Sequence, residues 1–317
     1  MIVPANEVVF MLDVVLLDGG GGRELARMGA PFRQPEWSAL ALMEAPDFVS
    51  RMHQRYVEAG ADVITTNSYA VVPFHLGSAV FADRGAELAG LAGRLAREIA
   101  GAARRRVAVA GSLPPVCGSY RADLFDPAEA RPILQVLLRG LAAHVDYWLA
   151  ETLSTIEEAE LVREVIDGAD IADRPVWLSF TLEDESAVRG EPRLRSGQAV
   201  AEAVAAAIRL RAAAVLFNCS QPEVMEDAVS VARTEATQAG LRIGVYANAF
   251  PPQPKDATAN DGLSEIRADL TPENYLAFAK VWRQRGASIL GGCCGIGPEH
   301  INALRRGLTS VGQVGRT

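Results

Sequence analysis

Two adjacent cysteines near the C-terminus are the first residues of this chain that could do chemistry. Cys293 and Cys294 lie in the segment LGGCCGIG, residues 290–297, and the 317 residues include only two other cysteines, Cys117 and Cys219. Four cysteines in a chain of this length do not make a disulfide framework, and clustered cysteines point to metal binding or catalysis. A metal site, a redox pair and buried thiols that only pack are the three alternatives that the pair leaves open.

The glycines around this pair give its backbone unusual freedom. Glycines stand at Gly291, Gly292, Gly295 and Gly297. Glycine adopts positive φ readily and lets other backbone approach closely. We therefore expect these positions to let the backbone aim two neighbouring sulfur atoms at one point.

The segments that position the cysteines read as repeats of a buried strand followed by a helix. Short runs rich in Val, Ile and Leu occur at 14–20, 63–69, 107–113, 145–153, 176–182, 214–220, 243–249 and 288–295. Their near-continuous hydrophobicity is typical of strands covered on both faces. Helical patterns lie at about 47–59, 83–102, 127–143, 155–168, 197–210, 222–239, 271–286 and 298–308. Eight such units predict an α/β fold, a (β/α)8 TIM barrel, with an open doubly wound sheet as the alternative.

The predicted helices carry start and stop signals. Proline falls in the first helical turn in the pairs Asp126-Pro127, Gln221-Pro222, Thr271-Pro272 and Gly297-Pro298. Ser154 and Glu157 fit a capping box, and Gly60 and Gly286 stand where helices would end. Since no linker rich in Gly, Ser or Pro divides the chain, we expect residues 1–317 to form a single domain. The longest segment without a helix or strand pattern is 251–269, and a loop of that length in a compact domain is often functional.

Three of the four cysteines fall at the ends of predicted strands. Active sites of such barrels are built at the carboxyl ends of the strands. Cys219 ends the sixth strand, and Cys293 and Cys294 end the eighth, so their side chains can converge at the mouth. Three thiolates suit Zn²⁺, and a catalytic zinc site keeps its fourth position open. A closed structural site that includes Cys117, a redox pair and plain buried thiols remain alternatives to a catalytic metal at this point.

The motifs, taken together, resemble those of a known family. They are LLDGG at the first strand, HQRYVEAGADVITTNSY at the second helix and strand, AETLSTIEEAE at the fourth strand, and FNCS and LGGCCGIGPEHI at the sixth and eighth. In this order, from about Val15 to about Leu308, they resemble the homocysteine S-methyltransferase family. That family is the zinc-dependent, homocysteine-binding barrel shared by methionine synthase, betaine–homocysteine methyltransferase and the S-methylmethionine–homocysteine methyltransferases.

The resemblance implies a reaction and the residues that support it. A methyl group would pass from a small onium donor (S-methylmethionine, S-adenosylmethionine or a betaine-like compound) to the zinc-bound thiolate of homocysteine, giving methionine. The implied Zn²⁺ ligands are Cys219, Cys293 and Cys294. The implied binding residues for the amino-acid end of homocysteine are Asp18, the Gly19 backbone, Glu151 and, less directly, Thr66. The rival interpretations are another small thiol or selenol acceptor, and a zinc-braced barrel that binds an amino acid without catalysis.

The donor side of the site is less defined by the resemblance. An onium group favours aromatic faces, and Trp37, Phe74 and Tyr120 fall in predicted rim loops. Tyr69 is a further candidate, as a zinc contact in the substrate-free state. The run DGGGGREL departs from the family pattern at Gly21 and Arg23, which predicts either a more mobile loop or an Arg23 contact with a carboxylate.

The composition and the N-terminal sequence limit which partners and which cellular location we expect. The chain has 31 Lys and Arg against 39 Asp and Glu, a net charge of −8, which argues against a nucleic-acid partner. The first 20 residues lack a basic segment and contain acids, so no signal peptide is expected. No apolar run is long enough for a membrane span. We therefore expect a cytoplasmic enzyme.

Overall fold

The eight strands form one parallel sheet that curves into a barrel. The computed structural model describes residues 12–171, 173–254, 257 and 264–309. The strands are β1 (Val15–Leu16), β2 (Val63–Thr65), β3 (Ala108–Leu113), β4 (Tyr147–Leu153), β5 (Val176–Phe180), β6 (Ala214–Asn218), β7 (Arg242–Tyr246) and β8 (Ile289–Leu290). They pair in the order β1-β8-β7-β6-β5-β4-β3-β2, and a bridge between Leu17 and Val63 joins β1 to β2. The predicted TIM-barrel fold is confirmed.

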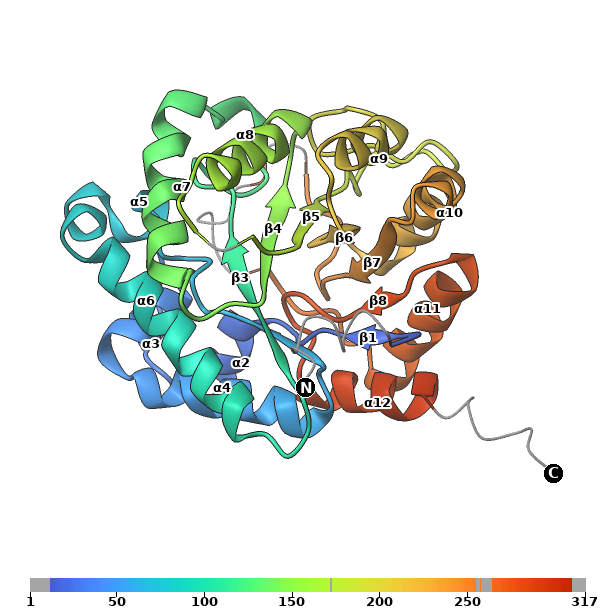
Figure 1. Cartoon of the computed structure of the whole chain (residues 1–317). Coiled ribbons are helices and arrows are strands. Elements are labelled where there is room, and N and C mark those ends of the chain that lie inside the picture. The colour runs from blue at the N-terminus through green and yellow to red at the C-terminus, as the bar shows by residue number, and fades with distance from the viewer. Residues whose placement is uncertain (1–11, 172, 255–256, 258–263, 310–317) are drawn as a thin grey trace, which may run out of the picture.

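Helices surround this sheet and follow the predicted order (Figure 1). They are α4 (Pro46–Ala59), α6 (Ser78–Ala102), α7 (Pro127–Leu141), α8 (Ile156–Asp167), α9 (Val200–Arg209), α10 (Pro222–Gln238), α11 (Pro272–Arg285) and α12 (Pro298–Thr309). Short helices that the sequence patterns did not predict are α2 (Gly21–Arg27), α3 (Ser38–Glu44), α5 (Pro73–Leu76) and the 3₁₀ turn η1 (Ala122–Leu124). All four lie in connections that follow β1, β2 or β3.

The helix boundaries confirm most of the expected signals and correct one. Gly60 ends α4 in the left-handed conformation, with φ 111°. The capping box at α8 lies one residue later than predicted, because Thr155, not Ser154, is the N-cap. The Thr155 side chain accepts from the Glu158 amide at 3.0 Å, and the Glu158 carboxylate accepts from the Thr155 amide at 2.9 Å. The prediction failed because two adjacent hydroxyl residues precede two adjacent glutamates, so the spacing fits both pairs.

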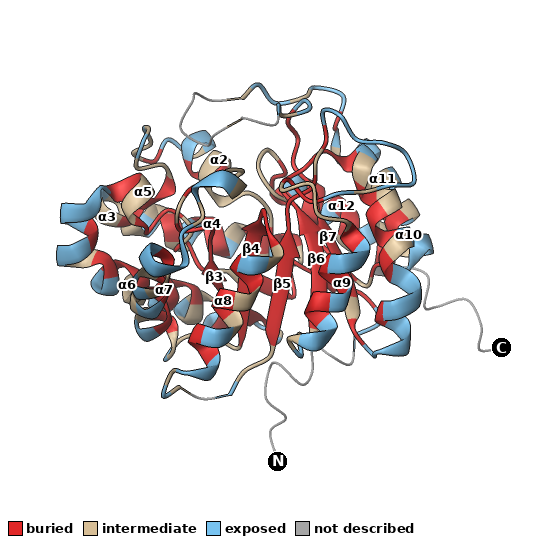
Figure 2. Cartoon of the chain, turned by 90° about the horizontal axis from the view of Figure 1, so that it is seen from above, coloured by how far each residue is buried: buried red, intermediate tan, exposed pale blue. Residues whose placement is uncertain are grey.

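The interior of the barrel below the strand ends is filled with side chains. Tyr147 and Trp177 stack there with ring centroids 4.6 Å apart, and the small residues Ala108, Ala110 and Ala214 leave room for them. The strands are buried, whereas the helices expose only their outer faces (Figure 2). The barrel is therefore closed by packed side chains beneath the mouth, and the open space lies at the carboxyl ends of the strands. In the part of the chain that the structure covers, no helix has the length and hydrophobicity needed to cross a membrane.

Candidate active site

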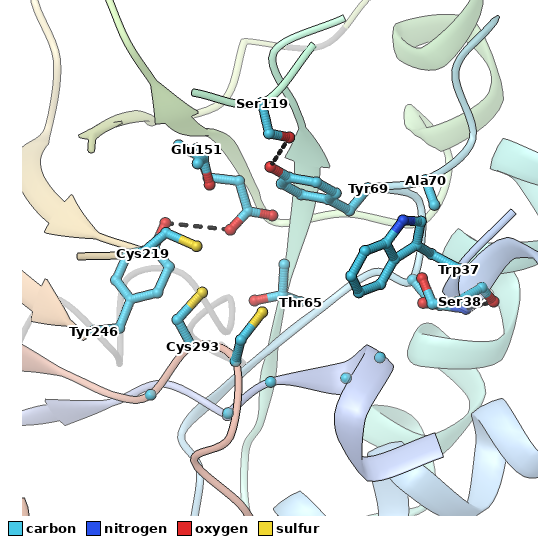
Figure 3. A pocket seen from close by; sticks show the side chains of 18 of the residues that line it. Trp37, Ser38, Thr65, Tyr69, Ala70, Ser119, Glu151, Cys219, Tyr246 and Cys293 are labelled. Carbon is cyan, nitrogen blue, oxygen red and sulfur yellow. Dashed lines mark hydrogen bonds between the residues drawn. The ribbon is translucent and has the colours of Figure 1, made fainter. Parts of the chain in front are cut away.

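Three cysteine sulfur atoms meet at the carboxyl ends of β6 and β8. The Sγ atoms of Cys219, Cys293 and Cys294 all lie within 4.8 Å of one another, and Figure 3 shows those of Cys219 and Cys293 pointing into the same space. Tetrahedral zinc with Zn–S bonds of about 2.3 Å holds its sulfur ligands about 3.8 Å apart, so these positions fit the ion. Cys117 is not part of this group among the residues described, and its thiol faces the Asp126 carbonyl at 3.9 Å.

The cluster already favours one thiolate. Hydrogen bonds from the Cys219 and Cys293 thiols hold the pKa of the Cys294 thiol well below its usual value, and the Arg23 guanidinium lowers it further. Thiolate is the form of cysteine that binds metals. The pKa values of the Cys219 and Cys293 thiols are raised well above their usual value, so without a metal the cluster holds one thiolate and two thiols.

Close packing explains most of the glycines near the cysteines. A Cβ on Gly20 would stand 2.5 Å from the Cys293 carbonyl oxygen, and one on Gly291 would stand 2.5 Å from the Leu17 Cβ. A Cβ on Gly292 would come at least as close to the Ile296 side chain. Of the four glycines expected to supply freedom, only Gly295 has a positive φ, at 84°. Gly291 is required where the loop after β8 touches the loop after β1, whereas Gly292 packs on Ile296 of its own loop and a Cβ on Gly297 would stand 2.9 Å from the Glu299 carboxylate.

Two buried tyrosines hold these loops from behind. The Tyr56 hydroxyl of α4 donates to the carbonyl oxygens of Ile296, at 3.2 Å, and Gly20, at 3.3 Å. The Tyr275 hydroxyl of α11 donates to the Gly291 carbonyl oxygen at 2.7 Å. Neither contact could be predicted from the sequence, because a buried tyrosine on a helix has the same pattern as any other core residue. Both tyrosines fix the backbone from which Cys293 and Cys294 project.

Gly20→Ala is expected to weaken zinc binding about tenfold, the lower range for residues that support metal ligands. The new methyl group would push the Cys293–Cys294 backbone out of place, because Gly20 packs against it. Zinc affinity by competition with a chromophoric chelator measures the effect. Gly22→Ala, also in the segment after β1, is the matched control. The new Cβ of this α2 residue would meet only ordinary contacts, at 3.7 Å or more. An equal loss in both variants would contradict the packing argument.

Asp18 follows shortly after β1 and lines the pocket. Its carboxylate also holds β2 in place. Its Oδ2 accepts from the Thr65 amide at 2.7 Å, and its Oδ1 accepts from the Thr65 hydroxyl at 3.0 Å. Burial raises the pKa of the Asp18 carboxyl to about 7 against these hydrogen bonds. Gly19 beside it packs directly on the Ile296 carbonyl. Asp18 therefore has a structural task in addition to any contact with a ligand.

Glu151 projects into the barrel from an irregularity in β4. The register shifts between Ala150 and Leu153, and Thr152 adopts a positive φ of 61°. Asn218 of β6 holds this bulge, because its Oδ1 accepts from the Thr152 amide at 3.0 Å and its Nδ2 donates to the Thr152 hydroxyl at 2.9 Å. Asn218 belongs to the FNCS motif at the end of β6, and holding the bulge is its role in the structure.

The Glu151 carboxyl group faces the thiols and is buried. It accepts hydrogen bonds from the Ser112 hydroxyl at 2.5 Å and from the Tyr246 hydroxyl at 3.2 Å, and Figure 3 shows the second of these. Burial raises its pKa to about 7, although both hydrogen bonds lower it. Tyr246 escaped the sequence analysis, although its inward position on β7 follows from the alternation of that strand.

Thr66 lines the same pocket, but its hydroxyl group is already used in hydrogen bonds within the protein. Its hydroxyl accepts from the Ser112 amide at 3.0 Å and lies 2.9 Å from the Ser68 hydroxyl. Neighbouring Asn67 donates to the Ser38 carbonyl at 3.1 Å. These contacts tie the connection after β2 to β3 and α3.

The pocket enclosed by these residues has a cavity volume of about 190 Å³, enough for a small amino acid. Its lining includes the three clustered cysteines, Asp18, Gly19, Thr66 and Glu151. It also includes Trp37, Tyr120, Thr152 and Cys219, which are non-glycine residues with positive φ. Each such residue costs roughly 1–3 kcal/mol and persists only where the surroundings impose it. Strain of this kind gathers at this pocket.

Three of the four aromatic residues proposed for the mouth line the pocket, and one does not. Trp37, Tyr69 and Tyr120 line the pocket, whereas Phe74 packs edge-on against the His75 ring with centroids 5.1 Å apart and is absent from the lining. The Tyr69 hydroxyl lies 2.7 Å from the Ser119 hydroxyl. Tyr120 instead contacts a cysteine sulfur.

The departures at Gly21 and Arg23 form the first turn of α2. The Arg23 Nη2 donates to the Ser264 carbonyl at 2.5 Å, and its guanidinium lies 5.5 Å from the Phe250 ring centroid. Within the described part of the chain, these contacts join Arg23 to the segment after β7 and not to a carboxylate. Within 251–269, Gln253 and Ser264 line the pocket, while 255–256 and 258–263 lie outside the described residues.

Comparison with known proteins agrees with the site. The model of the homocysteine S-methyltransferase family matches residues 15–308. Homocysteine S-methyltransferase 1 of Arabidopsis thaliana is 30% identical over 92% of this chain and 93% of its own length. A selenocysteine Se-methyltransferase of Brassica oleracea var. italica is 28% identical over 93% of this chain and 89% of its own length.

A solved structure shows the same likeness in three dimensions. The metallated form of the homocysteine methyltransferase MmuM from Escherichia coli matches with a TM-score of 0.74 and 27% identity, covering 96% of this chain and 99% of that one. The family match spans almost all of the barrel, including the three clustered cysteines. The chain therefore belongs to the homocysteine S-methyltransferase family.

Proposed function

We propose that this protein is a zinc-dependent methyltransferase that moves a methyl group from a small onium donor to the sulfur of homocysteine, giving methionine. The observation that carries the proposal is the group of three cysteine sulfur atoms within 4.8 Å of one another, in one pocket with two buried carboxyl groups. Cys219, Cys293 and Cys294 would hold the ion. Zn²⁺ there supplies the acidity that makes a bound thiol a thiolate at neutral pH.

The carboxyl groups suit the other end of the substrate. Asp18 and Glu151 line the pocket from β1 and β4, and an ammonium group needs oxygen acceptors of this kind. Their raised pKa values, about 7 each, mean that an arriving ammonium would favour the ionised form of both. The amino-acid end of homocysteine would therefore be held on the side of the pocket that these strands form.

The donor would approach from the outer part of the pocket. Trp37 offers an aromatic face there, which suits a sulfonium or quaternary ammonium group. Gln253 and Ser264, from the segment after β7, line the same cavity and would shape its donor side. Holding the methyl carbon in line with the acceptor sulfur supplies acceleration by orientation.

The deciding experiment is an assay of reduced, zinc-loaded protein with homocysteine and separate donors: S-methylmethionine, S-adenosylmethionine and betaine. We expect methionine to accumulate with one onium donor and to disappear when a chelator removes the zinc. No product from any donor, with one zinc bound per chain, would contradict the proposal and favour a binding role.

A second acceptor belongs in the same assay. The sequence identity to a selenocysteine Se-methyltransferase, 28%, is close to the 30% identity to a homocysteine S-methyltransferase. Zinc-assisted alkylation needs only a soft, acidic nucleophile, so a selenol could use the same site. A higher kcat/KM for selenocysteine than for homocysteine would favour this second function.

A further inference from the structure

One pocket-lining phenol contacts a candidate zinc ligand directly. The Tyr120 hydroxyl lies 2.7 Å from the Cys219 sulfur and 3.4 Å from the Cys219 carbonyl oxygen. Tyr120 comes from the connection between β3 and α7, whereas Cys219 follows β6. Both have positive φ, 67° and 56° respectively. Two strained residues from distant strands are thus brought into contact, which points to a specific task.

A buried cation fixes the ring of this phenol. The Arg195 guanidinium lies 4.9 Å from the centroid of the Tyr120 ring, and the Arg195 residue is only 4% exposed. Its Nη1 donates to the Gln253 carbonyl at 2.9 Å and lies 3.5 Å from the Asp184 carboxylate. A cation over an aromatic face is attracted to the ring. This contact therefore holds the Tyr120 ring where its hydroxyl meets the Cys219 sulfur.

In the proposed reaction, the donor could methylate a cysteine ligand in place of the substrate sulfur. Metal-bound cysteine thiolates are nucleophiles, like the substrate sulfur. If a cysteine took the methyl group, a new S–CH₃ bond would form, the donor's C–S or C–N bond would break, and the donor would leave as a neutral sulfide or amine. The cysteine would become a neutral thioether and a poor zinc ligand.

We propose that Tyr120 is a positioning residue that protects Cys219 from methylation by donating a hydrogen bond to its sulfur. In the zinc-bound protein Cys219 would be a thiolate without a proton, so the phenol would be the donor in this pair. The bond withdraws charge from the Cys219 sulfur and occupies the side of it that faces Tyr120. The substrate sulfur, which lacks this partner, then remains the better nucleophile. This inference rests on the proposed function.

The test compares Tyr120→Phe with the wild type, both zinc-loaded and free of substrate. Each protein is treated with iodomethane, and peptide mass spectrometry gives the ratio of methylation at Cys219 to that at Cys293. We expect the ratio to rise about tenfold in Tyr120→Phe, which corresponds to the loss of one hydrogen bond to a charged group. In Co²⁺-loaded protein, the sulfur-to-metal charge-transfer band should move to lower energy.

Tyr69→Phe is the matched control, because it also removes a pocket phenol but one that contacts the Ser119 hydroxyl. We expect the methylation ratio and the charge-transfer band of this variant to match the wild type. An unchanged ratio in Tyr120→Phe, with zinc bound and a native circular dichroism spectrum, would overturn the protective role. A wild-type chain that binds no zinc would instead overturn the proposed function.

Discussion

Replacing Cys294 by alanine is expected to lower methyl transfer at least about a thousandfold, because the substrate loses both its activated form and its orientation. Two thiolates remain to hold the ion, and the cysteine whose pKa the cluster lowers is the one removed. Without zinc, an ordinary thiol with a pKa of about 8.5 is mostly protonated at neutral pH. Zinc content per chain and methionine formed are the two measurements.

Cys117→Ala provides the matched control for this variant. It removes the remaining cysteine of the chain, which lies outside the sulfur group and faces the Asp126 carbonyl. Both zinc content and rate should stay at the wild-type level. Full activity in Cys294→Ala, or loss of zinc in Cys117→Ala, would show that the ligand set has been assigned wrongly.

The convergence of the cysteines could be predicted because it depends on topology. Parallel strands end at one edge of the sheet, so residues that follow β6 and β8 must share that edge once the strand order is known. The order follows from repeated strand and helix units, which leave a strong periodic signal in the sequence. Cys219, Cys293 and Cys294 were therefore placed correctly at the strand ends without any knowledge of their contacts.

The contacts themselves could not be predicted, because they join residues far apart in the chain. The 2.7 Å approach of Tyr120 to Cys219 spans 99 positions and depends on two strained backbone conformations. The brace that Tyr56 gives to Ile296 spans 240 positions. Neither has a local pattern. Asp18 shows the same limit, since the LLDGG motif singled it out but its double hydrogen bond to Thr65 was not evident.

Glu151 illustrates how a site proposed to bind a cation reduces the stability of the empty protein. Its pKa is raised from 4.5 to about 7, so the folded state holds the proton more tightly than the unfolded state. The resulting stabilisation is complete below pH 4.5 and is lost as the pH rises through 7. At pH 8 the buried charge costs roughly 3 kcal/mol. Glu151→Gln should therefore raise the melting temperature at pH 8 and change it little at pH 5.

The same substitution should harm substrate binding. Glu151→Gln removes a charged acceptor for the ammonium group, and we expect KM for homocysteine to rise about tenfold to a hundredfold with a smaller change in kcat. Steady-state kinetics at saturating donor give both constants. Glu158→Gln is the matched control, because Glu158 is also buried with a pKa of about 7 but caps α8. A KM that rises equally in both variants would mean that Glu151 acts on the fold and not on the substrate. If KM rises in Glu151→Gln alone while its melting temperature at pH 8 increases, the carboxylate is kept for binding at the expense of stability.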